Sequence, residues 1–409
     1  MASRARWWIF LLLGLACGRE VPIYDVEPWA HEPPPIPALA GRIVVANSAE
    51  DSLSILDPAM PAAAQRLPIG FNPVDRFRPR RLASDRQGRF LYVLLDLPAP
   101  PGESGPHGTH GAMIPPGWIT RVDTATVRAA PWVAVDPHPG EVVLSGDGRR
   151  LYLTHYDLDR WGHSGHDDPR AGDATLTIID TDTGGITARV VLCPGPHGLG
   201  LSRDERTLYA TCVSDELAVV DLAAAPPVVR RVPLPGRDDS LVGDCRECPF
   251  ALAVAPDGLV WVANRGRFNG ANGSGSLMVF DPGAGAFDPG TTVRMLGRGA
   301  WVGFATTAAS YRAYVIEQGV SESRVHAYAP PAPGAAAAEL EALALAPPVC
   351  TLAHALAITP DGRHGHLVCE GDHLSAGTLL QLGLEPLAIE GTVPLGLLPE
   401  GIALMPPRQ

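Results

Sequence analysis

Histidine and cysteine are the residue types in this chain with the widest range of chemistry, and their spacing follows a pattern. Imidazole acts as a general base or a metal ligand near neutral pH, and cysteine forms disulfides or binds metals. Two cysteine pairs share a separation of 19 positions: Cys193 with Cys212, and Cys350 with Cys369. The first cysteine of each pair stands four residues before a histidine, His197 or His354. This regularity indicates a repeated structural unit that places these groups in equivalent positions.

The repeated unit contains a short strand-forming phrase with an aromatic residue. It reads Leu-Tyr-Leu-Thr-His at 151–155 and Val-Trp-Val-Ala-Asn at 260–264, with further copies at 208–212 and 313–317. A second phrase ends in aspartate and follows after a variable loop, as in Thr-Leu-Thr-Ile-Ile-Asp at 175–180. An apolar strand and a tight Asp-Gly turn precede several copies. Many short strands joined by turns predict an all-β protein.

The number and order of these units predict a closed seven-bladed β-propeller. The inner strand of each blade begins at one of seven places: near residues 80, 140, 197, 250, 301, 354 and 400. No inner strand precedes the phrase at 42–47, and no further strands follow the last one at 401–405. These two incomplete ends together make one blade. A C-terminal strand therefore completes the first blade and closes the ring, which removes open sheet edges.

These phrases resemble the repeat of the YVTN family of bacterial seven-bladed β-propellers. The family consensus runs Ser-Pro-Asp-Gly-x-x-Leu-Tyr-Val-Thr-Asn and continues into a strand that ends in Ile-Asp. The resemblance extends over residues 41–406, is strong in blades three to five, and is weak in blade six and around 363–366 in blade seven. It implies the fold but no reaction, because related propellers include binding proteins, lactonases and electron-transfer enzymes.

The N-terminus has the pattern of an export signal. Arg4 and Arg6 precede an apolar run at 7–15 that is too short to span a bilayer as a helix. The run ends in Gly14-Leu15-Ala16-Cys17, which resembles the lipobox of bacterial lipoproteins, although that pattern prefers leucine at the position of Gly14. We therefore predict a signal peptide over 1–17 and lipidation of Cys17. A plain signal peptide without a lipid is the alternative.

Residues 18–40 are rich in proline and are expected to form an extended tether to the propeller at 41–406. The predicted location is the bacterial cell envelope, on the periplasmic or outer-membrane surface, with the lipid as the membrane contact. The formal net charge of −12 argues against a nucleic-acid partner, because no basic stripe is present to neutralise phosphates. A protein or a small molecule is therefore the expected partner.

The loops between the second and third strands of the blades indicate the functional face. They are long and irregular, at 96–117, 156–174, 265–275 and 370–377, and functional residues concentrate on variable loops held by a rigid scaffold. On the same face, the first residues of the inner strands form a polar ring around the mouth of the central channel. The ring predicts a ligand-binding site composed of Arg80, Glu141, His197, His354 and Glu400, with Gly140 as the alternative to Glu141.

A metal site is an alternative on this face, because histidines are frequent in its loops. Imidazole and carboxylate ligands suit zinc or copper. The candidate ligands are His155, His163, His166, His197 and His354. No short spacing on one element enforces a metal site, however, and histidines in loops are commonly only solvated.

Disulfides are the expected state of the six cysteines that follow Cys17 in an exported chain. In a propeller, the first cysteine of each 19-residue pair lies in a connection to an inner strand, and the second ends a second strand on the same face. The predicted bridges are Cys193–Cys212, Cys350–Cys369 and Cys245–Cys248. A redox or haem site is the alternative for the Cys-x-x-Cys motif, but haem attachment needs a histidine where Pro249 follows.

Motifs for a nucleophile elbow, a dinucleotide loop or a phosphate loop do not occur in the sequence where they could function. The sequence therefore favours a binding or scaffold protein over an enzyme. The alternative is a metal-dependent or lactonase-like hydrolase. Such an enzyme would use the channel-mouth histidine, glutamate and arginine side chains as base, acid and anion clamp.

Overall fold

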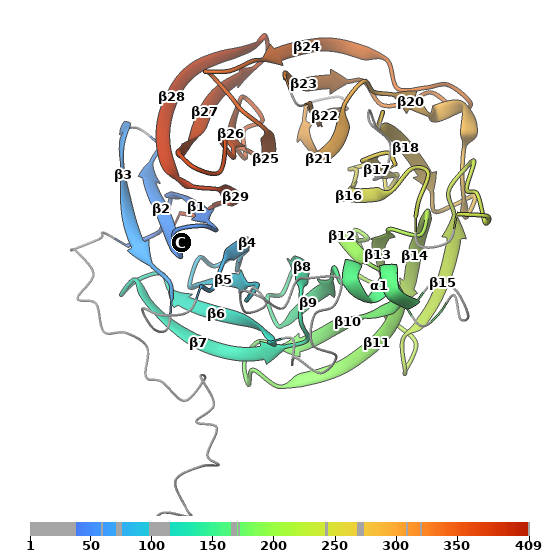
Figure 1. Cartoon of the computed structure of the whole chain (residues 1–409), viewed down its shortest axis with the longest axis horizontal. Coiled ribbons are helices and arrows are strands. Elements are labelled where there is room, and N and C mark those ends of the chain that lie inside the picture. Colours follow the sequence, from blue (N-terminus) through green and yellow to red (C-terminus); the bar gives the residue numbers. More distant parts are fainter. Residues whose placement is uncertain are drawn as a thin grey trace, which may run out of the picture.

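The chain folds as a seven-bladed β-propeller, as the sequence predicts (Figure 1). This computed structural model describes residues 38–58, 60–70, 76–97, 115–164, 170, 172–241, 244–267, 274–307, 310–319 and 321–407. The predicted signal peptide, Cys17 and most of the predicted tether lie outside these residues. Within the described ranges, no helix is long and apolar enough to cross a membrane.

Each blade is an antiparallel sheet that runs from an inner strand at the channel to an outer strand at the rim (Figure 1). From inner to outer, blade 1 has β29 (Pro399–Leu404), β1 (Ile43–Asn47), β2 (Ser52–Asp57) and β3 (Met60–Pro68); blade 2 has β4 (Pro79–Ser84), β5 (Phe90–Leu95), β6 (Gly117–Asp123) and β7 (Arg128–Val135); blade 3 has β8 (Pro139–Leu144), β9 (Arg150–His155), β10 (Asp173–Asp180) and β11 (Ile186–Pro194).

The remaining blades follow the same order. Blade 4 has β12 (Pro196–Leu201), β13 (Thr207–Cys212), β14 (Glu216–Asp221) and β15 (Val228–Pro233); blade 5 has β16 (Pro249–Val254), β17 (Val260–Asn264), β18 (Ser276–Asp281) and the short β19 (Ala286–Phe287) and β20 (Val293–Arg294); blade 6 has β21 (Arg298–Thr306), β22 (Tyr311–Gln318), β23 (Ser323–Tyr328) and β24 (Glu339–Leu345); blade 7 has β25 (Ala353–Ile358), β26 (His364–Cys369), β27 (Ala376–Leu384) and β28 (Leu387–Leu397).

The outer edge of blade 5 is interrupted, and one long loop contains a helix. Between β19 and β20 the chain forms a 3-10 turn, η2 (Pro289–Thr291), which the Asp288 side chain caps by accepting the N–H of Gly290. The loop expected over 156–174 contains the helix α1 (Leu158–Ser164). The Asp157 carboxylate accepts the N–H of Arg160 at 2.8 Å and so stabilises the first turn of this helix.

The C-terminal strand closes the ring by pairing with the first strand of the chain. β29 lies antiparallel to β1, with Val44 opposite Ala403 and Val45 opposite Ile402. The closed part of the chain begins slightly before the predicted boundary at 41, because Leu39 is fully buried and its N–H donates to the carbonyl of Thr124 at 2.8 Å.

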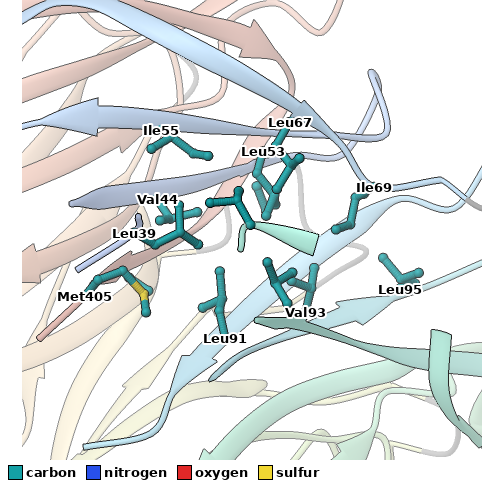
Figure 2. Close-up of a cluster of buried hydrophobic side chains, with 14 of the residues drawn as sticks. Leu39, Val44, Leu53, Ile55, Leu67, Ile69, Leu91, Val93, Leu95 and Met405 are labelled. Atoms are coloured by element: carbon teal, nitrogen blue, oxygen red, sulfur yellow. The ribbon is translucent and has the colours of Figure 1, made fainter. Parts of the chain in front are cut away.

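The core is divided into layers between neighbouring blades. Side chains alternate along a strand, so Val44 and Ala46 of β1 pack toward blade 2 whereas Ile43 and Val45 pack toward blade 7. Figure 2 shows the layer between blades 1 and 2, where side chains such as Leu53 meet those of the next blade. This two-sided burial explains why the second strands are apolar at nearly every position and gives the inner strands a rigid support.

The three disulfide pairings predicted from the sequence are confirmed. The bridges are Cys193–Cys212, Cys245–Cys248 and Cys350–Cys369, with Cα–Cα distances of 5.8, 5.1 and 5.4 Å. Cys193 lies in the outer strand of blade 3, and Cys212 ends the second strand of blade 4. That bridge therefore joins two consecutive blades on the face of the long loops.

Candidate functional site

A cavity of about 570 Å³ lies at the end of the channel on the face of the long loops. Every blade supplies its wall from the start of the inner strand, and blades 2, 3, 5, 6 and 7 also supply it from the end of the second strand. Residues of the first kind are Arg80, Arg81, Pro139, Gly140, His197, Phe250, Arg298, His354 and Glu400; those of the second kind are Asp96, Tyr156, Arg265, Gln318 and Glu370.

The chain enters the inner strands through a repeated turn. In six blades the residue directly before the inner strand has a φ between 41° and 55°: Arg78, His138, Gly195, Cys248, Leu352 and Leu398. Only one of them is glycine, although other residues rarely adopt this left-handed conformation. Such strain persists where the surrounding fold over-determines the backbone, and here it directs His138, Leu352 and Leu398 toward the cavity.

Arg80 is fully engaged by two buried carboxylates. Its Nη1 lies 2.8 Å from Asp96 Oδ2, and its Nη2 lies 3.0 Å from Glu400 Oε1. Glu400 also accepts a hydrogen bond from the Ser48 hydroxyl. Burial opposes ionisation of Glu400, but the charge of Arg80, together with smaller contributions from Arg81, His354 and the Ser48 hydroxyl, outweighs burial and lowers the pKa of this carboxyl. This cluster joins the closing strand of blade 1 to blade 2.

A chain of charged groups extends from Arg81 across the cavity wall. Arg81 Nε is 3.1 Å from Glu141 Oε2, and its Nη2 is 3.2 Å from His354 Nε2. Because arginine only donates, His354 Nε2 accepts and its Nδ1 donates to Glu370. Burial raises the pKa of Glu370, but hydrogen bonds from His354 and His373 outweigh it and lower this pKa to about 2.

His373 ends this chain in a position suited to proton transfer. Its Nε2 lies 2.7 Å from Glu370 Oε2, and its side chain is 48% exposed at the cavity. The neutral ring donates through Nε2, which leaves the Nδ1 lone pair without a hydrogen bond to any described residue. The backbone of His373 has a φ of +63°. A carboxylate that orients an imidazole in this way is the usual support of a general base.

Aromatic rings form the opposite wall. The ring of His197 stacks on Phe250 with centroids 3.8 Å apart, and Tyr156 meets His197 edge-on at 4.8 Å. His197 Nδ1 donates to the carbonyl of Phe250 at 3.1 Å. Burial, and then the charges of nearby arginines, lower the pKa of His197 well below its usual value. His197 is therefore neutral near pH 7.

Arg265 and Arg298 are cationic groups of the cavity without a carboxylate partner among the described residues. The Arg265 guanidinium lies 3.5 Å from the centre of the Phe250 ring, and its Nε is buried with no hydrogen-bond partner in the described part of the chain. Burial lowers the pKa of Arg265, and the charge of Arg298 acts in the same direction. Two neighbouring guanidinium groups without a salt-bridged carboxylate among the described residues have the chemistry that binds an anion, since arginine binds carboxylate and phosphate through paired hydrogen bonds.

The structure places four of the five predicted ligand residues in the cavity wall: Arg80, His197, His354 and Glu400. Glu141 is not in the wall; the adjacent Gly140 is. Glu141 pairs with Arg81 instead, at the point where the register of β8 with β9 shifts between Pro139 and Val142.

The sequence analysis missed residues that the structure places in the same wall: Arg81, Arg265, Arg298 and Glu370. Four of the wall residues directly follow the last residue of their second strand, namely Asp96, Tyr156, Arg265 and Glu370. Comparing this position across the repeats would have identified Arg265 and Glu370 from the sequence.

Of the predicted metal ligands, His197 and His354 both line the cavity, whereas His155 does not. His155 is buried, its Nδ1 donates to the carbonyl of Pro137 at 3.1 Å, and its Nε2 lies 2.9 Å from the Thr177 hydroxyl. His166 and the side chain of His163 lie outside the described part of the molecule. Over the described residues, no group of three or more His, Cys, Asp or Glu could hold a metal.

The fold and cavity define the molecule as a seven-bladed β-propeller with an arginine-bearing cavity at its channel mouth. No family model matches the chain, and no curated protein matches it. Solved propeller structures resemble it at low sequence identity, which supports the fold alone.

One similar structure is the periplasmic gluconolactonase of Pseudomonas aeruginosa, which is 18% identical, with a TM-score of 0.57 over 88% of this chain and 98% of that one. Hydrazine synthase of Kuenenia stuttgartiensis is 15% identical, with a TM-score of 0.55 over 79% of this chain and 88% of that one. Dihydro-heme d1 dehydrogenase is also 15% identical, with a TM-score of 0.51 over 93% and 79%. The activities of these three proteins differ.

Proposed function

We propose that this protein binds a small organic anion at the channel mouth. The observation that carries the proposal is the pair of arginines, Arg265 and Arg298, that face the cavity without a carboxylate partner among the described residues. Arg80 differs from them because Asp96 and Glu400 already neutralise it. The free arginines supply both the charge and the planar donors that a carboxylate or phosphate group requires.

The size and polarity of the cavity agree with such a ligand. Its volume of about 570 Å³ lies within the usual range for small-molecule sites, about 300–1,000 Å³. Glu370, His373 and Gln318 offer hydrogen-bonding groups for hydroxyls on the far side from the aromatic wall. Because the whole chain has a net charge of −12, attraction for an anion would come from these local arginines and not from the overall charge.

Titration calorimetry of the full chain with D-gluconate, citrate and inorganic phosphate tests the proposal. Saturable binding of at least one of these anions, with one site per chain, is expected. The affinity should fall as ionic strength rises, because a partly exposed charge pair is screened by salt. Absence of binding for all three anions at low ionic strength contradicts the proposal.

Lactone hydrolysis is a second candidate function, favoured by the His373–Glu370 pair. His373 Nδ1 would take a proton from water, the resulting hydroxide would add to the lactone carbonyl, and the ring C–O bond would break to give a hydroxy-carboxylate. The proton returns to the alkoxide that leaves. Arg265 and Arg298 would stabilise the negative charge on the carbonyl oxygen. The periplasmic gluconolactonase with the same fold gives this reaction chemical precedent.

Replacing His373 with glutamine is expected to lower kcat for D-glucono-δ-lactone by about 10²–10⁴-fold, the usual contribution of a general base. Gluconate affinity should change little, since glutamine keeps a hydrogen-bonding group at the site. The rate is measured above spontaneous hydrolysis across a pH series. His364→Gln is the control, because His364 is also half-exposed and paired with a glutamate but is not part of the cavity wall. Wild-type protein that does not exceed the spontaneous rate excludes this activity.

We further propose that the protein is an exported, lipid-anchored member of the YVTN-repeat propellers, with its membrane contact limited to the lipid. The three disulfides support an oxidising compartment, and the sequence of 14–17 supports lipidation.

Changing Cys17 to serine is expected to move the protein from the membrane fraction to the soluble fraction of the cell envelope. The reason is that serine cannot form the thioether that attaches the lipid. Fractionation followed by mass measurement of the N-terminal peptide gives the result. An unchanged distribution, or an unmodified Cys17 in the wild-type protein, refutes the lipid anchor.

A further inference from the structure

The loop 244–248, closed by the Cys245–Cys248 bridge, lies directly beside Arg265. The N–H of Arg265 donates to the carbonyl of Cys248 at 3.0 Å, and the N–H of Gly266 donates to the carbonyl of Glu247 at 2.8 Å. The side chain of Arg267 completes the contact, with its Nε 2.8 Å from Asp244 Oδ2. The three consecutive residues 265–267 are thus attached to this one loop.

A single carboxylate holds the loop from the other side. Asp215 accepts the N–H groups of Arg246, Glu247 and Cys248 at 2.7, 3.0 and 2.9 Å. The buried Glu247 side chain adds contacts to Arg294 and to the Ser276 hydroxyl. The backbone of the loop is therefore saturated with hydrogen bonds on both sides, and it has little freedom to move while the bridge is intact.

The helix α1 and Val213 bury the bridge. Leu158 and Trp161 of α1 pack with Val213 against the two cysteines, each of which is only 1% exposed. The residue two positions after Cys248 is Phe250, the ring on which the Arg265 guanidinium lies. The segment 244–250 therefore supplies both supports of Arg265, the hydrogen bonds to its backbone and the surface under its side chain.

We propose that the Cys245–Cys248 bridge is a positioning element of the anion site, which acts by fixing the backbone and the stacked guanidinium of Arg265. This inference rests on the proposed anion binding. A bridge between residues three apart closes a very short loop and removes little entropy from the unfolded chain. Its main effect is therefore on local geometry. A site of this kind loses affinity when its supporting groups are free to shift.

Gluconate titration of Cys245→Ser/Cys248→Ser tests the proposal in the full chain. The double variant should lose affinity by about the same factor as Arg265→Gln, on the order of tenfold or more. Combining all three changes should weaken binding no further than Arg265→Gln alone, because the bridge acts through that side chain. Cys193→Ser/Cys212→Ser is the matched control: it removes a bridge of larger separation, 19 residues, and should lower the thermal midpoint more while keeping gluconate affinity.

Asp215→Asn provides a second variant that leaves the bridge intact and loosens the same loop. Asp215→Asn should also weaken gluconate binding. When it is combined with Arg265→Gln, it should cause no further loss of affinity. Wild-type affinity in the Cys245→Ser/Cys248→Ser protein overturns the positioning role, as does a loss that adds to that of Arg265→Gln. Absence of gluconate, citrate and phosphate binding by the wild-type chain is a different result, and it removes the proposed function itself.

Discussion

Replacing Arg265 with glutamine is expected to weaken gluconate binding by about 10–100-fold. A hydrogen bond to a charged group contributes about 1.5–3 kcal/mol, and each 1.4 kcal/mol corresponds to a factor of about ten in affinity. The effect should lie toward the upper end because the Arg265 Nε is buried and has no hydrogen-bond partner among the residues that the structure describes. Titration calorimetry at low ionic strength measures the difference.

Two further variants separate charge from geometry at this position. Arg265→Lys keeps the charge but loses the planar group that stacks on Phe250, so its affinity should fall between those of the wild type and Arg265→Gln. Arg312→Gln is the control for a general loss of positive charge, because Arg312 pairs with Glu385 outside the cavity wall. Equal affinities for wild-type and Arg265→Gln protein would show that the anion binds elsewhere.

Acidification is expected to destabilise the fold between about pH 6.5 and pH 4, and His366 is one identifiable cause. His366 takes the place of the aromatic residue in the repeated phrase and is 4% exposed, with its Nδ1 unpaired. Burial, and then the charge of His364, lower the pKa of His366 to about 4. The unfolded chain binds this proton near pH 6.5, whereas the folded chain binds it only near pH 4. The contribution of His366 to stability is therefore fully present above pH 6.5, and the free energy of unfolding falls by up to about 3 kcal/mol as the pH drops through this window.

Other histidines modify this dependence in known directions. The pKa values of His155 and His197 are lowered, chiefly by burial, so both add to the loss of stability in acid. His326 acts in the opposite direction: burial opposes its protonation, but the hydrogen bonds that its ring donates to Glu317 and Glu339, together with their charges, outweigh burial and raise its pKa. Its contribution is present below pH 6.5 and is lost as the pH rises through its raised value. Three histidines have lowered pKa values and one has a raised pKa value, so together they leave a net loss of folding stability in acid.

The His366→Tyr variant restores the repeat's usual residue and should reduce the difference in unfolding free energy between pH 7 and pH 5. Urea denaturation at the two pH values measures that difference. The converse change, Tyr152→His, places a histidine at the equivalent position of blade 3, where Tyr152 is 2% exposed. This variant should increase the difference in unfolding free energy between the two pH values. An identical pH dependence in wild-type and His366→Tyr protein would remove His366 as a cause.

Most of the fold was predictable because its determinants are local and repeated. Each blade carries the same apolar strand, tight turn and aromatic phrase, so the number of blades and the closing strand follow from counting. The bridges Cys193–Cys212 and Cys350–Cys369 followed from equal spacing within equivalent blades. The helix α1 did not follow, because a seven-residue element within a long loop depends on its contacts with Val213 and the Cys245–Cys248 bridge.

The candidate site was predictable only in part. The sequence indicated the channel mouth, because the start of each inner strand recurs in register with the repeat. It could not indicate which charged side chains lack a salt-bridge partner, since Arg80 and Arg265 are the same residue type and both line the cavity. Their difference lies in partners supplied by other strands: Asp96 and Glu400 hold Arg80, whereas Phe250 lies beneath Arg265.

By itself, the sequence determined the seven blades, the closure, the cystine pairs and the face on which to look for a site. The tertiary structure decided which groups on that face meet. It directed His155 away from the other histidines into a buried pair of hydrogen bonds and joined His354 to Glu370 and His373. It left Arg265 stacked on Phe250, without a salt-bridged carboxylate among the described residues. The physical reason is that strand pattern depends on neighbours in sequence, whereas hydrogen bonding and charge balance at the channel depend on residues from different blades.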